Sequence, residues 1–211
     1  MMPAMVEAAV KTVLSLVLAG LAAAYACGWR RLCTAGHAPS LWRLALYALG
    51  LTTVAAALLS PLDDLAAARF SAHMGQHLLL TMVAAPLLLL GNPLPLVLWG
   101  LPPPVRWRLA APLRPRARLR AALSALTFLP VAGVLHVTTV WLWHLPVLYD
   151  AAVEHELVHA FEHATLFATA ILFWWPIIQP APRLRPRPEF TAKGSARGDP
   201  REPCALLRSW K

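Results

Sequence analysis

The chain has 211 residues, of which 58% are hydrophobic and 14% are charged. Soluble domains carry about 25% charged residues, so this composition excludes an ordinary soluble enzyme. The apolar residues fall in blocks of about 20, the length that one helical crossing of a bilayer requires. The composition therefore predicts an all-α fold, a small polytopic integral membrane helical bundle.

The net charge is +9, from 19 basic and 10 acidic residues. In a soluble chain such an excess would suggest nucleic acid as a partner. Here most of the basic residues flank apolar segments, in the stretches 100–121 and 180–211, as the charges that set membrane topology do. We therefore expect the lipid bilayer as a partner, and no nucleic acid.

We expect about five membrane-spanning helices within a transmembrane domain over residues 1–179. Their predicted ranges are 6–26, 41–59, 73–91, 121–145 and 157–178. Pro86 lies inside the third range and predicts a kink there, since proline cannot donate the usual backbone hydrogen bond. The segment PLVLWGLPPP that follows is too short and too rich in proline to cross a bilayer, so we place it at the membrane interface.

Residues 180–211 form a second region, which is basic and rich in proline and arginine. Its low hydrophobicity predicts a disordered tail. The first and third loops and this tail are basic, whereas the second and fourth loops are acidic. Basic loops stay on the cytoplasmic side of a membrane, so this alternation predicts an N-terminus outside and a C-terminus in the cytoplasm.

Histidines gather near one predicted face of the membrane. Six of the eight map to the outer ends of the third, fourth and fifth spans: His73, His77, His144, His155, His159 and His163. Those on the third and fifth spans are four residues apart, which places them on one face of each helix. Neutral imidazole is a ligand for copper, zinc, iron and nickel, so the group predicts a metal or haem site. For the isolated His37 and His136 we favour an ordinary polar role.

Other donor groups accompany the histidines. Nearby carboxylates would attract a cation and orient the ring nitrogens as second-shell acceptors, namely Asp63, Asp64, Asp150, Glu156 and Glu162. Met74 and Met82 on the third span are candidate thioether ligands for cuprous ion. A methionine in an apolar helix more often has a packing role, and we favour that role for both.

Two stretches of the sequence carry a family pattern. The first is SPLDDLAAARFSAHMGQHLLLTMVAAPLLLLGNPLPL, which contains the element HMxQH. The second is WLWHLPVLYDAAVEHELVHAFEHATLFATAILFWWPII, which contains HxxxHxxEH and FWWP. In this order, over about residues 40–180, they resemble the polytopic CtaG-type cytochrome c oxidase assembly factors, which are associated with caa3-type oxidases.

The resemblance implies a bacterial cytoplasmic-membrane protein that is an assembly factor and not an enzyme. Its partners would be subunits of a haem-copper cytochrome c oxidase, and copper would be supplied at the outer face. The six histidines named above correspond to those of the family. Family members usually continue with further spans beyond the FWWP element, so the resemblance also implies either a short variant or an altered gene end.

Two alternatives stay open on the sequence alone. The first is a haem-b electron carrier, in which one histidine of the third span and one of the fifth ligate the iron. The second is a membrane metalloprotease that uses the HELVH motif at 155–159, with Glu156 as general base. A Soret band would indicate the haem protein, and zinc alone would indicate the hydrolase.

Overall fold

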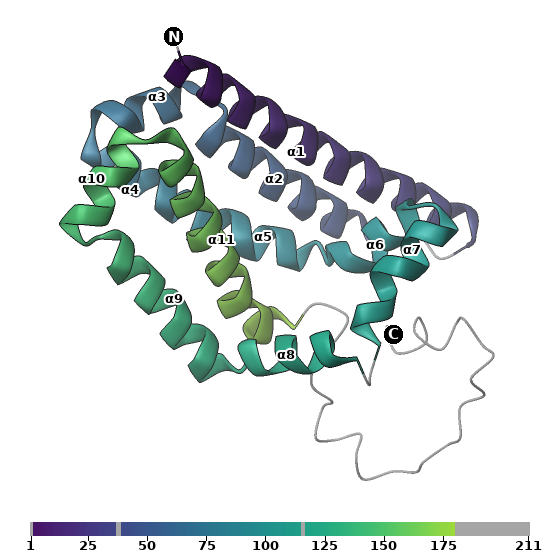
Figure 1. The fold of residues 1–211 in the computed structure, drawn as a ribbon. Coiled ribbons are helices and arrows are strands. Elements are labelled where there is room, and N and C mark those ends of the chain that lie inside the picture. The colour runs from purple at the N-terminus through teal and green to yellow at the C-terminus, as the bar shows by residue number, and fades with distance from the viewer. Residues whose placement is uncertain (1, 37–38, 115–116, 180–211) are drawn as a thin grey trace.

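The computed structural model describes residues 2–36, 39–114 and 117–179, and every regular element in these ranges is a helix (Figure 1). Four helices are long and apolar enough to cross a membrane, and a bent pair is a fifth candidate. The structure therefore confirms the predicted all-α polytopic bundle. His37 and the predicted tail at 180–211 lie outside the described residues.

Helices α1 (Met2–Thr34) and α2 (Leu41–Leu58) run side by side along one face of the bundle (Figure 1). α1 extends beyond the predicted range 6–26 at both ends, because the prediction followed the apolar run, whereas the helix continues through Arg30 and Arg31 to Thr34. Gly36 follows with a φ of 77°, the left-handed conformation that commonly ends a helix. Most of α1 is exposed, as expected for a helix that contacts lipid.

The acidic loop after α2 contains the short helix α3 (Pro61–Ala68), and the third span comes next. This span runs from Phe70 to Leu90, close to its predicted range of 73–91. It consists of α4 (Phe70–Leu78), the π-helical turn η1 (Leu79–Ala84) and α5 (Ala85–Leu90).

Pro86, where the sequence predicts a kink, follows directly after this π-helical turn and lies in α5. The backbone N–H of Ala85 donates to the carbonyl of Leu80, five residues earlier. The next bond in this register would join Thr81 to Pro86, which has no N–H. The indole Nε1 of Trp174 donates to the Thr81 carbonyl instead, at 2.9 Å. A neighbouring helix thus supplies the donor that proline lacks.

The proline-rich segment that we placed at the interface forms a helix, α6 (Pro93–Gly100), and packs against the second half of α1. Glycines permit this close approach. A Cβ atom on Gly28 would overlap the carbonyl oxygen of Leu96, and one on Gly100 would overlap that of Ala24. Small residues at helix interfaces allow such backbone-to-backbone packing in membrane proteins.

The fourth predicted span, 121–145, differs from the structure. It is divided into α8 (Arg118–Leu126) and α9 (Leu129–Trp143), whose axes differ in direction by 71°. Pro130 explains the division, because it cannot donate to the carbonyl of Leu126 and its ring would clash there. The connection before α8 contains α7 (Pro103–Ala110) and the 3-10 turn η2 (Ala111–Leu113).

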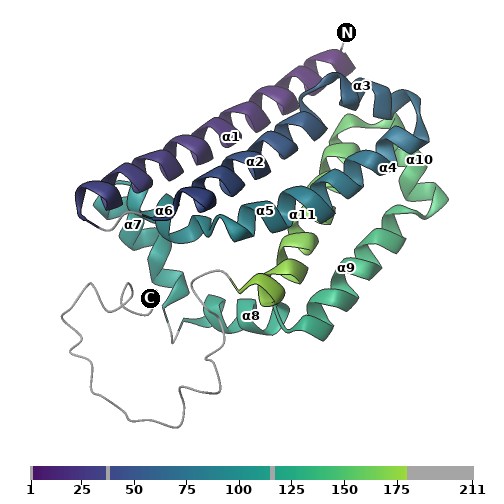
Figure 2. The ribbon, with the colours of Figure 1, turned by 180° about the vertical axis from the view of Figure 1, so that it is seen from behind.

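Helices α10 (Pro146–Glu154) and α11 (Glu156–Ile178) complete the described fold. α11 occupies the centre of the arrangement and packs against α9, α5 and η1. Figure 2 shows α3, α4 and α10 at one end of the molecule and α6 and α7 at the other. The first half of α11 lies at the end that holds α4, so the histidines of both helices are brought to the same level.

Candidate metal centre

Helix α4 contributes one polar face to the interior of the bundle. His73, Gln76 and His77 are all buried, and Gln76 is 0% exposed. Their spacing of three and four residues places them on one side of a helix. Leu80, one turn further, continues this face into the apolar core with Val54 and Ala84.

Helix α11 supplies the opposing face with the same spacing. His159, Glu162 and His163 are followed one turn later by the buried Leu166. Glu162 is only 1% exposed, although a carboxylate is among the costliest groups to bury. Its burial within a candidate membrane span makes it a candidate functional residue.

The carboxylate of Glu162 lies between the two histidines of α4. Its Oε1 is 3.6 Å from Nε2 of His77, and its Oε2 is 3.7 Å from Nε2 of His73. Both distances exceed those of a normal hydrogen bond. The three groups therefore face one another without direct bonds between them.

The imidazole rings of the two helices form one cluster around His73. The centroid of its ring is 4.4 Å from that of His77, 5.3 Å from that of His159 and 5.9 Å from that of His163. The rings of His159 and His163 are 4.3 Å apart. These four histidines and Glu162 are named the histidine–glutamate centre below.

Most of the polar atoms of this centre have no hydrogen-bond partner within the described residues. These buried atoms are Nε2 of His73, both ring nitrogens of His77, Nε2 of His159, Nε2 of His163 and Oε2 of Glu162. Buried polar groups are normally paired, because an unpaired one costs about 1–3 kcal/mol. Such a concentration of unpaired polar atoms is a feature of a ligand site.

Within the histidine–glutamate centre, two sets of three residues are close enough to share one ion. His73, His159 and His163 form one set, and His73, His77 and Glu162 form the other. In each set the ligand atoms lie within 4.8 Å of one another. His73 belongs to both, so the two sets are adjacent parts of one centre.

His144 lies beside this centre but does not belong to either set. It follows the last residue of α9 and is exposed. Its ring centroid is 6.4 Å from that of His77. The Nε2 atom of His144 instead faces the sulfur of Met74, on α4, at 3.3 Å.

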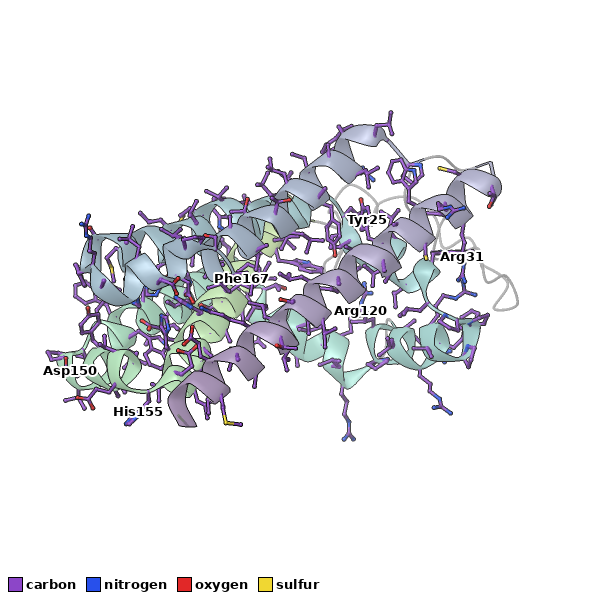
Figure 3. All side chains as sticks on the ribbon, turned by 90° about the horizontal axis from the view of Figure 1, so that it is seen from above. Tyr25, Arg31, Arg120, Asp150, His155 and Phe167 are labelled. Atoms are coloured by element: carbon purple, nitrogen blue, oxygen red, sulfur yellow. The ribbon has the colours of Figure 1, made fainter. Side chains whose placement is uncertain are left out.

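His155 is also outside both sets, since it precedes α11 in an extended conformation and is exposed. Figure 3 shows His155 and Asp150 at one end of the molecule and Arg31 near the other. Asp150 is exposed on α10, and Glu156 is half-buried at the start of α11. Of the five predicted second-shell carboxylates, only Glu162 lies within the centre itself.

The remaining two carboxylates, Asp63 and Asp64 on α3, belong to a polar network that includes Gln76, a residue on the same face of α4 as His73 and His77. Nε2 of Gln76 donates to Oδ1 of Asp63 at 2.8 Å and to the Ala57 carbonyl at 2.7 Å. Lys11 of α1 lies 3.1 Å from Oδ2 of Asp63 and 3.6 Å from Oδ1 of Asp64. A polar network therefore joins α1, α2, α3 and α4 at the end of the bundle that holds the histidines.

The contributions of Gln76 and Lys11 were not predicted from the sequence. The sequence contains a signal for a role of Gln76, because this residue is polar and lies in the HMxQH element of an apolar span. The sequence contains no such signal for Lys11, because α1 and α3 are distant in sequence and only the fold brings them together. Glu162 was predicted to support the ligands from outside, whereas its oxygens face the ring nitrogens directly.

Fold and site together define a multi-pass helical membrane protein with a buried histidine–glutamate centre. The family model described as cytochrome c oxidase caa3 assembly factor matches residues 23–195 of the chain. This range covers most of the sequence and includes every member of the centre. The chain therefore belongs to the family of cytochrome c oxidase caa3 assembly factors, as its motifs predicted.

Uncharacterised mycobacterial proteins are among its relatives. The chain is 31% identical over 180 residues to a protein of Mycobacterium bovis and, equally, to one of Mycobacterium tuberculosis. It is 27% identical over 173 residues to a protein of Mycobacterium leprae. The matches cover 77–80% of this chain but only 25–26% of the relatives, so the chain spans about a quarter of their length. No solved structure matches the chain.

Proposed function

We propose that this protein serves the assembly of a caa3-type cytochrome c oxidase by binding a copper ion in the histidine–glutamate centre and passing it to an oxidase subunit. Membership of the assembly-factor family supports the oxidase as partner. One observation carries the proposal of a metal: three buried histidines, the half-buried His159 and the buried Glu162 converge, and most of their side-chain nitrogen and oxygen atoms have no hydrogen-bond partner within the described residues.

The donor set favours copper over the hard cations. Calcium and magnesium prefer sites made of oxygen atoms, whereas this centre offers ring nitrogens and one carboxylate. Among divalent first-row metals, copper binds such nitrogen-rich sites most tightly. A haem-copper oxidase also requires copper, so the chemistry of the site and the family point to the same ion.

The centre contains more donors than one ion needs, which suits a protein that releases its cargo. The two sets of ligands share His73, so an ion bound by one set lies next to the other. Structural metal sites, in contrast, are closed by four fixed ligands. In this proposal copper is the cargo of the protein and not a resident cofactor.

The two alternative functions receive less support from the geometry. The ring of His73 lies 5.3 and 5.9 Å from the rings of His159 and His163 on α11, so a planar macrocycle between α4 and α11 would require these rings to move apart. The first histidine of the HELVH motif, His155, has an extended backbone and precedes α11, whereas His159 lies within α11. An HExxH site requires both histidines on one helical face.

The proposal is tested by measuring the copper bound per chain in the purified, detergent-solubilised protein. We expect bound copper in the wild type and a loss of it in the His73→Ala/His77→Ala double variant. His155→Ala is the matched control, since this histidine is exposed and outside the centre. In the host, oxidase activity should fall with the double variant and not with the control.

Two results would contradict the proposal. If the double variant keeps its copper and supports normal oxidase activity, these histidines are not functional ligands. A Soret band in the wild-type spectrum would indicate bound haem instead. The visible spectrum should therefore be recorded on the same samples.

A further inference from the structure

An imidazole nitrogen and a thioether sulfur face each other at the exposed edge of the histidine–glutamate centre. Nε2 of His144, at the end of α9, lies 3.3 Å from Sδ of Met74 on α4. His144 is exposed, and Met74 is partly exposed beside it. The contact joins α4 and the end of α9 through two residues that are 70 positions apart in the sequence.

The hydrogen-bond partners of His144 show which ring nitrogen carries the proton. Its Nδ1 lies 2.7 Å from the carbonyl oxygen of Val140. A carbonyl can only accept, so Nδ1 carries a hydrogen, and the neutral tautomer with this bond has a free lone pair on Nε2. The thioether sulfur of Met74 is also only an acceptor. In this neutral tautomer two lone pairs face each other across the contact.

We propose that His144 and Met74 form an exposed loading site for a soft monovalent cation, cuprous ion, next to the histidine–glutamate centre. Thioether sulfur selects Cu(I) over harder ions, and imidazole accepts it. Bonds from a closed-shell ion such as zinc to nitrogen and sulfur are about 2.0 and 2.3 Å. At a separation of 3.3 Å, one ion of this size would contact both atoms with an angle of about 100° between the bonds.

The position of this loading site links the exterior to the buried ligands. The ring of His144 is 6.4 Å from that of His77, which belongs to the set with His73 and Glu162. An ion released by His144 and Met74 is therefore close to a buried ligand, His77. Two protein ligands also leave coordination positions open for a donor or acceptor protein. This order of sites rests on the proposed copper function, but binding at the pair can be measured separately.

The test is an anaerobic titration of the solubilised full chain with Cu(I) in competition with a chromophoric chelator. All proteins should carry Cys27→Ser, Cys33→Ser and Cys204→Ser, so that thiols do not bind the probe. Met74→Leu removes the sulfur and preserves the shape of the side chain. Met82→Leu is the matched control, because Met82 is an exposed methionine of the same span.

We expect Met74→Leu to lose one bound Cu(I) per chain, or to weaken it at least ~10-fold, since even the loss of a group that supports a ligand costs about 10–100-fold. His144→Ala should behave in the same way. Met82→Leu should match the wild type, and Zn(II) binding should be unchanged in Met74→Leu. X-ray absorption of the copper-loaded wild type should show a sulfur neighbour that Met74→Leu lacks.

The outcomes separate this proposal from the one on which it rests. If His73→Ala/His77→Ala keeps the ion that Met74→Leu loses, the loading site exists independently of the buried centre. If Met74→Leu binds Cu(I) like the wild type, or the wild type shows no sulfur neighbour, the loading site is refuted. That result would leave copper binding by the buried centre intact.

Discussion

Nε1 of Trp174 donates a hydrogen bond to the carbonyl oxygen of Thr81 at 2.9 Å. The first residue belongs to the FWWP element of α11, and the second lies in the π-helical turn of the third span. Thr81 is one turn beyond His77, and its hydroxyl donates to the His77 carbonyl. This bond therefore holds the two helices of the histidine–glutamate centre in register.

Replacing Trp174 with Phe should loosen the alignment of α11 with the third span without removing any metal ligand. The carbonyl of Thr81 would lose its donor, and an unpaired buried carbonyl costs about 1–3 kcal/mol. We expect a lower thermal unfolding midpoint and weaker metal binding. Both are measured on the solubilised protein by a thermal unfolding assay and by chelator competition.

Trp175→Phe is the matched control for this change. The indole nitrogen of Trp175 is buried and has no hydrogen-bond partner within the described residues, so its removal breaks no bond. Pro86→Ala provides a second check, since alanine restores a backbone N–H in the π-helical turn. If Trp174→Phe is equally costly with and without Pro86→Ala, the bond does not compensate for the proline.

Replacing Glu162 with Gln should separate metal affinity from stability. The amide keeps the shape of the side chain but removes a buried charge, whose desolvation is unfavourable when no cation offsets it. We expect the metal-free protein to unfold at a higher temperature and the affinity for copper to fall by at least ~10-fold. Thermal unfolding and metal titration of the same preparation measure both effects.

Glu154→Gln is the control, because Glu154 is an exposed carboxylate near the same end of the bundle. It should change neither quantity. Unaltered copper affinity in Glu162→Gln would show that the carboxylate is not a ligand. The set formed by His73 and His77 would then need a different third member.

Sequence patterns predicted the parts of the fold that depend on local composition. Apolar length located the third and fifth spans, and the spacing of four residues placed His73 with His77 and His159 with His163. These features depend on one helix at a time. The periodicity of a helix is enough to show which residues share a face.

The sequence did not predict features that depend on two elements at once. His144 and His155 were grouped with the other histidines by their predicted depth, but the ends of α9 and α11 leave both exposed. The predicted depth of a residue in the membrane does not determine whether its side chain faces the interior of the bundle. The division of the fourth span had a local signal in Pro130, which was outweighed by the continuous apolar run around it.

Substituting Gly100 with Ala should disrupt the packing of α6 on α1. The new Cβ would overlap the carbonyl oxygen of Ala24, a backbone atom that cannot move away alone. Overpacking of this kind typically costs about 1–3 kcal/mol. We expect a clear drop in the unfolding midpoint, measured by thermal unfolding in detergent.

Gly20→Ala is the matched control on α1, since a Cβ at this position meets no atom within 4 Å. Alanine favours a helix more than glycine does, so this variant should be as stable as the wild type or more so. Equal stability of Gly100→Ala and the wild type would show that α6 does not pack closely against α1 in the membrane.

The orientation of the bundle in the membrane can be tested with single cysteines. Cys33 is exposed in the last turn of α1, near the arginines that we predict to face the cytoplasm. Asp150→Cys, in a chain otherwise free of cysteine, places a thiol at the end that carries the histidines. Basic segments remain inside, so a membrane-impermeant maleimide should label intact spheroplasts at position 150 and should label Cys33 only after permeabilisation. The reverse pattern would place the histidine–glutamate centre and its exposed edge at the cytoplasmic face. Copper would then have to enter from the cytoplasm, and delivery at the outer face would be ruled out.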